Sequence, residues 1–371
     1  MRTVVVAAAI VAIASPAYAQ FGALNKGLKR AQQVQDLQIT DSEEHQIGAE
    51  VSARLRARFG VVQDKEIHKY VTSVGMLLAQ ESTRASLPWT FIVLDTDGVN
   101  AFASPGGFIH VTKGALALIA NEAQLAGVLG HEITHVTEKH TINAIRKSKA
   151  VQIGADEAGG NKGLLVKAMA GKVYEMVIEN SFDRGDEGEA DKKGVALAAK
   201  AGYAPAGLAD FLATLAGRNK GQKERNGLFA SHPETQDRIE KIRKDAASLK
   251  GSAALVAARY TSHVKYQPID LTEVPQAGEG AAGLAGGSSS KSGETPKGET
   301  KAAQEQPRKK GFGLGSLKRA VAPEGQSAQV SASGGARGVG PDRNANGGPN
   351  AALVTVTVTA AELAAFKKGI A

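Results

Sequence analysis

The run His131-Glu132-Ile133-Thr134-His135 constrains this chain more than any other feature. On a helix, residues four apart lie on one face, so His131 and His135 can bind the same metal ion. Zinc takes such imidazole nitrogens, and a catalytic zinc site keeps one position open for water. Glu132 is rotated off the ligand face and can accept a proton from that water. The competing interpretation is a solvated helix face whose two histidines serve structure only.

The residues before this run predict a buried helix. Asn121 is a typical helix cap, and Gln124 is placed three positions later to reach back to it. Apolar residues then recur at helical spacing, namely Leu125, Val128, Leu129, Ile133 and Val136. Polar groups on a buried helix need a partner, and a metal ion supplies one. We expect His140 to continue this helix at an offset from His135 that does not suit a third ligand, so we interpret it as structural.

The acidic stretch of residues 182–194 is where we expect the third ligand. Glu187 and Asp191 are four residues apart, on a helix face that otherwise carries small residues. Such a face lets two backbones approach closely, as a zinc site shared between two helices requires. We predict that Glu187 binds the metal and that Asp191 holds the other ring nitrogen of a ligand histidine. Asp186 and Glu189 are predicted to point into solvent, and a wholly solvated acidic surface is the alternative.

Further blocks accompany these residues in a fixed order. They are Asn100-Ala101-Phe102-Ala103-Ser104-Pro105-Gly106-Gly107, Asn121-Glu122, Glu187-Gly188-Glu189-Ala190-Asp191, and Ser231-His232-Pro233 with Arg238-Ile239. Together with the His-Glu-x-x-His run they cover roughly residues 41–245. This region resembles the gluzincin metalloendopeptidases, the family of HtpX and the prenyl-protein (CAAX) protease. In architecture it is more similar to periplasmic members such as BepA and LoiP, because HtpX and the prenyl protease are integral membrane enzymes.

The resemblance implies a zinc endopeptidase with one zinc ion per chain. It places the zinc ligands on His131, His135 and Glu187. It places the general base on Glu132, and on Asp191 the aspartate that orients a ligand histidine.

The resemblance also points to two further residues of the catalytic site. His232 falls on a histidine that can approach the zinc and either plug its open position or assist catalysis. Arg238 could polarise a substrate carbonyl or brace His232. The alternatives for these two residues are a helix cap and a surface ion pair. His45 departs from the family, which more often carries glutamates in this early helix, but the position is not catalytic.

The expected fold class is α+β: a mostly helical zincin-type metalloprotease domain with a small β-sheet edging the active-site cleft, followed by a disordered tail. Strands are predicted for residues 90–94, 100–103 and 108–111. The resemblance implies that an extended substrate adds beside the second of them through backbone hydrogen bonds. The residues of this substrate strand are Asn100, Ala101, Phe102 and Ala103. An ordinary hairpin in a small sheet is the alternative.

Composition, together with this resemblance, divides the chain into five parts. They are a signal peptide (1–19), a basic amphipathic N-terminal arm (20–40), a zinc metalloprotease domain (41–262), a disordered Gly/Ser/Ala/Pro-rich linker (263–350) and a short strand–helix C-terminal segment (351–371). In the last part, residues 353–358 alternate as in a strand, and Thr359 with Glu362 predicts a helix start. Such a unit cannot bury itself, so we expect it to dock on something.

Charge and cysteine content limit the partners. The formal net charge is +8, and basic residues are not interleaved with aromatic ones, so we expect no nucleic acid. We expect peripheral contact with a membrane or an envelope partner through the basic arms and the C-terminal segment. The absence of cysteine excludes disulfides and thiol catalysis. With a signal peptide and no apolar stretch long enough to span a bilayer, the chain is expected in the periplasm of a Gram-negative bacterium.

Two functions remain. The first is a zinc-dependent endopeptidase that hydrolyses peptide bonds of unfolded or misassembled cell-envelope proteins, through a zinc-activated water and Glu132 as base. The second is a non-proteolytic envelope chaperone or assembly factor that retains the protease fold. The complete ligand set and Glu132 favour the first, because an inactive homologue is expected to lose one of them.

Overall fold

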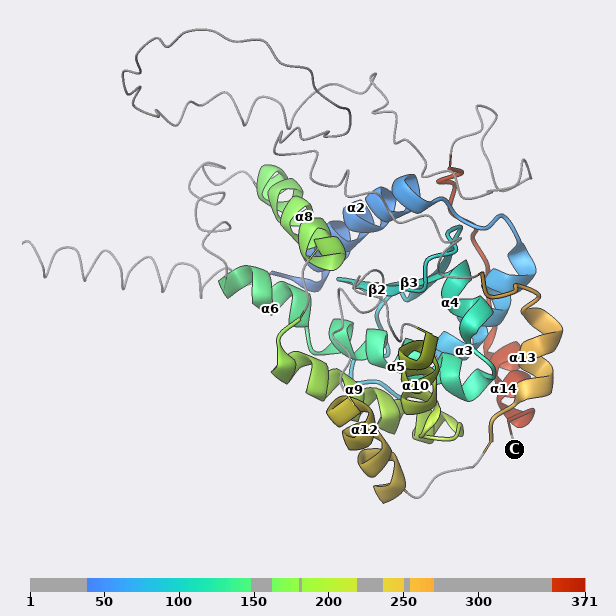
Figure 1. Cartoon of the computed structure of the whole chain (residues 1–371). Helices are drawn as coiled ribbons and strands as arrows, with labels where there is room; N and C mark the ends of the chain where they lie inside the picture. The colour runs from blue at the N-terminus through green and yellow to red at the C-terminus, as the bar shows by residue number, and fades with distance from the viewer. Residues whose placement is uncertain are drawn as a thin grey trace, which may run out of the picture.

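The computed structural model describes residues 39–147, 162–179, 182–218, 236–249, 254–269 and 349–370. They form a mostly helical domain with one small sheet (Figure 1), which confirms the expected α+β class. Several predicted parts lie outside the described residues: the signal peptide, nearly all of the N-terminal arm, most of the linker, and His232. The elements are, in chain order, α2 (Asp41–Phe59), α3 (Lys65–Gln80), β1 (Thr90–Leu94), β2 (Ala101–Ser104), β3 (Phe108–Thr112), α4 (Lys113–Leu118), α5 (Glu122–Thr137), α6 (His140–Lys147), α8 (Lys162–Glu179), α9 (Arg184–Ala201), α10 (Gly207–Arg218), α12 (Gln236–Ser248), α13 (Ala257–His263) and α14 (Ala360–Lys368).

Local sequence sets the limits of the first two helices. Thr40 and Glu43 form a capping box at the start of α2, where the Glu43 N–H donates to the Thr40 hydroxyl at 3.2 Å. Gly60 ends this helix at φ 78°, a conformation that side chains disfavour. Asp64 caps α3 by accepting a hydrogen bond from the Glu66 N–H at 2.8 Å. None of the described helices is both long enough and apolar enough to cross a membrane.

The sheet has the order β1–β3–β2, so β2 is an edge strand. β1 runs parallel to β3, and β2 runs antiparallel to β3 with Ala101 opposite Val111. The turn between β2 and β3 uses Gly106 and Gly107 at φ 73° and 102°. A Cβ on Gly106 would lie 2.4 Å from the Cα of His45, so this turn packs against α2 backbone to backbone.

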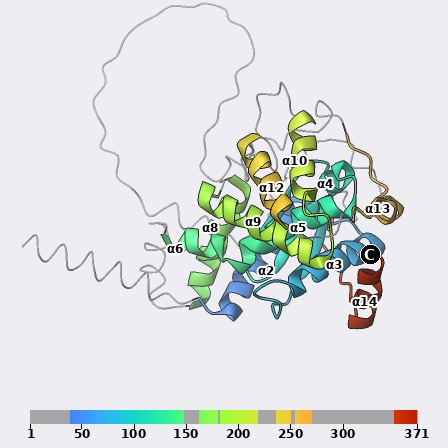
Figure 2. The same cartoon turned by 90° about the horizontal axis from the view of Figure 1, so that it is seen from below.

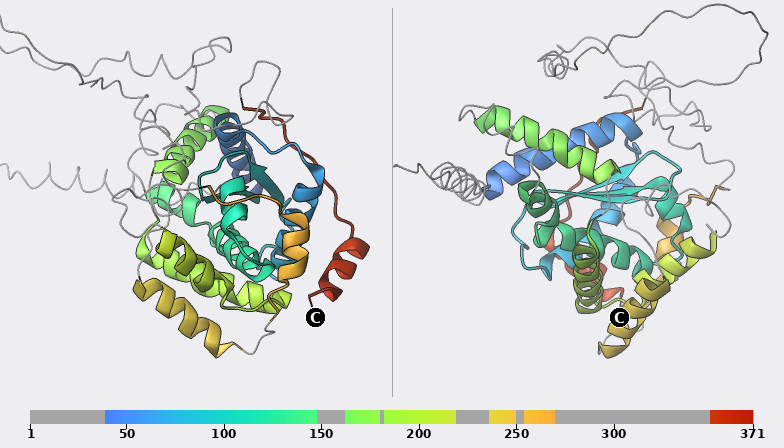
Figure 3. Two further views of the ribbon diagram at one scale, coloured as in Figure 1. Left: turned by 45° about the vertical axis from the view of Figure 1, so that its right-hand side comes forward. Right: turned by 60° about the vertical axis from the view of Figure 1, so that its left-hand side comes forward.

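Helices cover both faces of the sheet (Figure 3). α2 and α8 lie on one face, and α3 and α5 lie on the other. Side chains alternate along each strand, which divides the apolar interior into two clusters. The α2 and α8 cluster contains Ile92, Leu94, Phe102 and Phe108. The α3 and α5 cluster contains Phe91, Val93, Ala101, Ala103, Ile109 and Val111. β2 is thereby fixed next to α5, the helix that carries the His-Glu-x-x-His run.

The helices α5 and α9 touch backbone to backbone (Figure 2). A Cβ on Gly194 would lie 2.7 Å from the His131 nitrogen, and a Cβ on Gly130 would lie 2.7 Å from the Gly194 oxygen. Both distances are shorter than real Cβ contacts, so both positions require glycine. The close approach expected for the Gly194 face is therefore present, and it brings the acidic helix to the histidine face of α5.

Residues 349–370 lie against the domain. Thr359 and Glu362 form the predicted capping box at the start of α14. The predicted strand over residues 353–358 is wrong, because this stretch is extended without pairing to any described strand. α14 packs beside α3 (Figure 1), so this segment docks on its own domain.

Candidate metal centre

Two helices supply the three predicted metal ligands. α5 presents His131 and His135 one turn apart, and α9 presents Glu187. The two Nε2 atoms lie 3.1 Å apart. The carboxylate oxygens of Glu187 lie 3.7 Å from the Nε2 of His131 and 3.4 Å from the Nε2 of His135. All three residues are buried, and one ligand atom from each lies within 4.8 Å of the others.

These three groups fit a zinc ion. Two ligands of a tetrahedral zinc, each about 2.0–2.2 Å from the metal, lie about 3.3 Å from one another. The two Nε2 atoms, 3.1 Å apart, are close to that value, and each ring has a different Glu187 oxygen at a similar separation, Oε1 at 3.4 Å from His135 and Oε2 at 3.7 Å from His131. Two imidazoles and one carboxylate also form a ligand set of catalytic zinc sites, in which the fourth position stays open. The assignment of His131, His135 and Glu187 as ligands stays a prediction, and their geometry supports it.

Asp191, itself held by Arg238, contacts the Nδ1 atom of His131, the ring nitrogen that faces away from Glu187. The Oδ1 atom of Asp191 lies 3.0 Å from the Nδ1 of His131. Arg238 on α12 donates to both Asp191 oxygens at 2.8 Å and lies 3.0 Å from Glu187. Burial raises the pKa of Asp191, but hydrogen bonds from Arg238 and His131 outweigh it and lower that pKa to about 2. Asp191 therefore stays charged and can fix the orientation and tautomer of His131.

The buried position of Arg238 argues against a surface ion pair. Its side chain is only 11% exposed. Burial lowers the pKa of Arg238, but Asp191, followed by Glu187 and Glu132, raises it overall. Glu132 is itself buried at 1% exposure, so the predicted base, Arg238 and the ligand carboxylate share one electrostatic environment. His232 lies outside the described residues, so its predicted contact with the zinc stays a prediction.

His140 holds the outer side of His135, a contact that the sequence did not predict. α5 ends at Thr137, Lys139 adopts φ 57°, and α6 begins at His140. The prediction that His140 continues the same helix is therefore wrong. The break turns its ring back, so that its Nδ1 lies 3.0 Å from the Nδ1 of His135 and its Nε2 lies 3.3 Å from Glu189. Helical periodicity could not reveal this contact, because it depends on the left-handed residue between the two helices.

The contact between the two rings fixes their tautomers if His135 binds metal through Nε2. The Nδ1–H of His135 must then donate to the Nδ1 of His140, whose Nε2–H donates to Glu189. Glu189 also pairs with Lys193 at 2.8 Å, and Asp186 lies 3.8 Å from the His140 ring. The two acids that were predicted to be solvated thus contact His140, although the Glu189 side chain is also 43% exposed.

The edge strand β2 turns part of its backbone away from the sheet. The Thr112 N–H donates to the Asn100 carbonyl at 3.0 Å, which marks these two residues as a hydrogen-bonded pair. Such pairs alternate along an antiparallel ladder, so Phe102 directs its backbone groups toward β3. Ala101 and Ala103 direct theirs to the other side, but the two residues are 0% and 4% exposed, so a strand can add there only after this edge is uncovered. The Asn100 side chain accepts from the Ala101 N–H at 2.8 Å, which also holds the entry to this strand.

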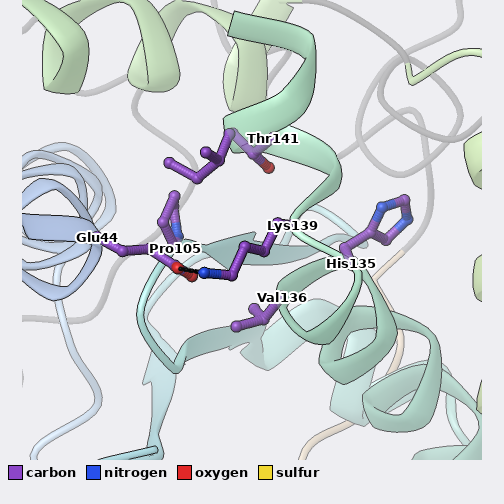
Figure 4. Close-up of a pocket in the computed structure, with 7 residues that line it drawn as sticks. Glu44, Pro105, His135, Val136, Lys139 and Thr141 are labelled. Carbon is purple, nitrogen blue, oxygen red and sulfur yellow. Dashed lines mark ion pairs between the residues drawn. The ribbon is translucent and has the colours of Figure 1, made fainter. Parts of the chain in front are cut away.

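Glu44 connects the end of the edge strand with the end of α5, and the sequence did not single it out. It is 1% exposed, and its carboxylate lies 2.8 Å from Arg84 and 3.0 Å from Lys139. It also accepts the Gly106 N–H of the β2–β3 turn at 3.1 Å. Arg84 donates to the carbonyl of Val136 in the last turn of α5. Figure 4 shows Lys139 reaching from the α5–α6 junction to Glu44.

Known proteins resemble this chain over the same region. Residues 65–246 match the model of peptidase family M48. The beta-barrel assembly-enhancing protease of Escherichia coli (strain K12) is 27% identical over 224 residues, which cover 57% of this chain and 45% of that protein. From the same organism, metalloprotease YcaL is 31% identical over 166 residues, covering 44% of this chain and 64% of that protein. Metalloprotease LoiP is 31% identical over 159 residues, covering 42% and 62%.

The matched region contains the whole candidate centre. It runs from the start of α3 to within α12 and includes His131, His135, Glu187, Asp191 and Arg238. The chain spans less than half the length of the assembly-enhancing protease and less than two thirds of the other two relatives. The resemblance that the sequence motifs indicated is confirmed: residues 65–246 of this chain match peptidase family M48.

Proposed function

We propose that this protein is a zinc-dependent endopeptidase. The observation that carries the proposal is the buried group of His131, His135 and Glu187. Glu132, also buried, lies on α5 with the two histidines. A zinc ion held there would supply Lewis-acid chemistry, polarising oxygen and making water acidic near neutral pH. One ion per chain is expected, because the described residues contain one such group.

The chain's own residues account for the other requirements of peptide hydrolysis. Glu132 accepts a proton from the attacking water and returns it to the leaving amine nitrogen. Asp191 and His140 hold the outer nitrogens of the two histidines, so both rings keep their Nε2 atoms toward Glu187. These contacts come from α9 and α6, which makes the centre rigid before a substrate arrives.

The substrates we propose are unfolded or misassembled proteins of the cell envelope. β2 can recognise an extended segment through the backbone groups of Ala103 that face away from β3, and such recognition does not depend on substrate sequence. Ala103 is 4% exposed, so a substrate must first displace the groups that cover this edge. One relative is named a beta-barrel assembly-enhancing protease, which fits a role in envelope quality control. We further propose a periplasmic location in a Gram-negative bacterium, with peripheral contact to a membrane or an envelope partner.

Zinc content and proteolysis measured on one sample test this function. The purified protein should contain about one zinc per chain and should cleave unfolded casein. A chelator should abolish cleavage, and added zinc should restore it. A zinc-loaded protein that prevents aggregation of unfolded proteins but cleaves none of them would favour the alternative, a non-proteolytic chaperone or assembly factor.

A further inference from the structure

The last helix presents one apolar face to the domain. Leu363, Phe366 and Ile370 recur at helical spacing, and Leu363 and Ile370 are each 4% exposed. All three belong to or pack on the core cluster that includes α3 and α5. Leu353, in the same segment but outside this face, is 41% exposed. Within residues 349–370, the apolar face of α14 is therefore buried against the domain, whereas Leu353 is not.

Ion pairs at both ends of α14 fix its direction. Glu362 in its first turn lies 2.7 Å from Lys69, near the start of α3. Lys367 in its last turn lies 3.3 Å from Glu81, just after the end of α3. Exposed pairs add little affinity, but reversing the helix would place like charges together. The surface thus selects one orientation.

The residues before α14 are held through their backbone. The Asn350 carbonyl accepts the Val61 N–H at 2.7 Å. Arg56 and Gln63 donate to the carbonyls of Ala351 and Ala352 at 2.6 and 3.0 Å. The docking surface thus has two parts, one for an extended stretch and one for an amphipathic helix.

A buried charge network lies directly under α14. Glu122, in the first turn of α5, is 0% exposed. Its carboxylate accepts hydrogen bonds from Arg259 at 2.5 and 2.6 Å, from Tyr70 at 2.9 Å and from Tyr203 at 3.1 Å. A buried carboxylate needs such partners, because an uncompensated charge away from water is costly. The network ties the start of α5 to α3, to α13 and to Tyr203, which follows the end of α9.

α14 completes this network on its outer side. Arg259 donates through Nη1 to the Phe366 carbonyl at 2.9 Å. Its guanidinium carbon also lies 3.9 Å from the centre of the Phe366 ring. Covering a guanidinium with an aromatic ring excludes water and strengthens its attraction to a carboxylate. Docking of the segment should therefore stabilise the first turns of α5.

We propose that the domain carries a docking surface whose occupant is this chain's own residues 349–370, and that the docked segment braces α5 through Phe366, Arg259 and Glu122. The chain is already fixed to the domain at Ile269, whose carbonyl accepts from Arg218. Residues 270–348 therefore connect two anchored points, and the segment is held by its own contacts rather than by that connection. The proposal is independent of zinc binding and proteolysis.

The test is to cut the connection. A site for a specific protease is inserted within residues 270–348 of the full chain, in a Glu132→Gln background that prevents self-cleavage. After the cut, the C-terminal fragment should co-elute with the domain in gel filtration at about 10 µM protein, and it should separate in denaturant. An intact fragment that elutes apart under native conditions would overturn the proposal without any substitution in the segment.

Two matched variants identify the contacts. Leu363→Asp with Phe366→Ala should release the cut fragment, whereas Leu353→Asp should leave it bound, because Leu353 lies outside the docked face. Release should lower the Tm by about 5–15 °C, since three large apolar side chains lose their cover. Hydrogen exchange should become faster in the first turns of α5 but not in α12. Unchanged exchange in α5 after release would refute the bracing role.

The oligomeric state checks the choice of occupant. The uncut protein should have the mass of one chain by light scattering. A two-chain mass, with the cut fragment retained by a differently tagged copy, would mean that the surface takes the segment of a second chain and would overturn the assignment in cis.

Discussion

Replacing Gly194 by alanine should weaken zinc binding without touching any proposed ligand. The added Cβ would lie 2.7 Å from the His131 nitrogen and 2.8 Å from the Gly130 carbonyl carbon. Ordinary contact begins at 3.4 Å, and both obstacles are backbone atoms, so α5 and α9 must separate by about 0.7 Å. Metal sites tolerate deviations of about 0.2 Å, and Glu187 lies on the helix that moves.

The expected loss is therefore at least about tenfold in zinc affinity, together with about 1–3 kcal/mol of stability from overpacking. Competition with a fluorescent chelator measures the affinity, and thermal denaturation with and without chelator measures the stability. Gly217→Ala is the matched control, because a Cβ there meets nothing within 4 Å. If Gly194→Ala binds zinc as tightly as Gly217→Ala does, the close helix contact does not hold the ligand set together.

Three further predictions concern the groups around the ligands. In chelator-treated protein, Asp191→Asn should flatten the fall in Tm between about pH 4 and pH 2. The folded-state pKa of Asp191 is about 2 against an ordinary 3.8, so its stabilisation, about 2 kcal/mol, is present above pH 4 and is lost on acidification; equal slopes in both proteins would contradict this. His140→Ala should lower zinc affinity about 10- to 100-fold at unchanged far-UV circular dichroism, because His135 loses its outer partner; wild-type affinity would remove this role. Glu44→Ala should cost about 3–5 kcal/mol in urea unfolding, because it leaves buried cations uncompensated, whereas Glu50→Ala on the exposed side of α2 should cost little; similar losses in both would refute it.

The sequence predicted correctly those features whose residues all lie within one helix or strand. The spacing of His131 and His135 predicted their common face, and the spacing of Glu187 and Asp191 predicted the face turned toward α5. Capping residues predicted the starts of α2, α5 and α14, since these bonds are local. Apolar runs predicted the three strands to within one residue.

The contacts that the sequence missed depend on how segments meet in space. The turn at Lys139 brings His140 back to His135, and no local pattern requires a left-handed lysine there. Glu44 looked like an ordinary acid in the first turn of a helix, yet packing buries it between Arg84 and Lys139. The C-terminal segment was expected to dock on something, but only the structure shows that the surface belongs to its own domain.

The catalytic role of Glu132 tests the account most directly. Casein turnover should be compared between the wild-type protein and Glu132→Gln at equal zinc content, with Glu66→Gln on the exposed side of α3 as control. Because Glu132 serves as the base and not as a ligand, the substitution should keep about one zinc per chain while turnover falls by about a hundred- to ten-thousand-fold. Glu66→Gln should match the wild type. Near-normal turnover by the zinc-loaded Glu132→Gln protein would contradict the account.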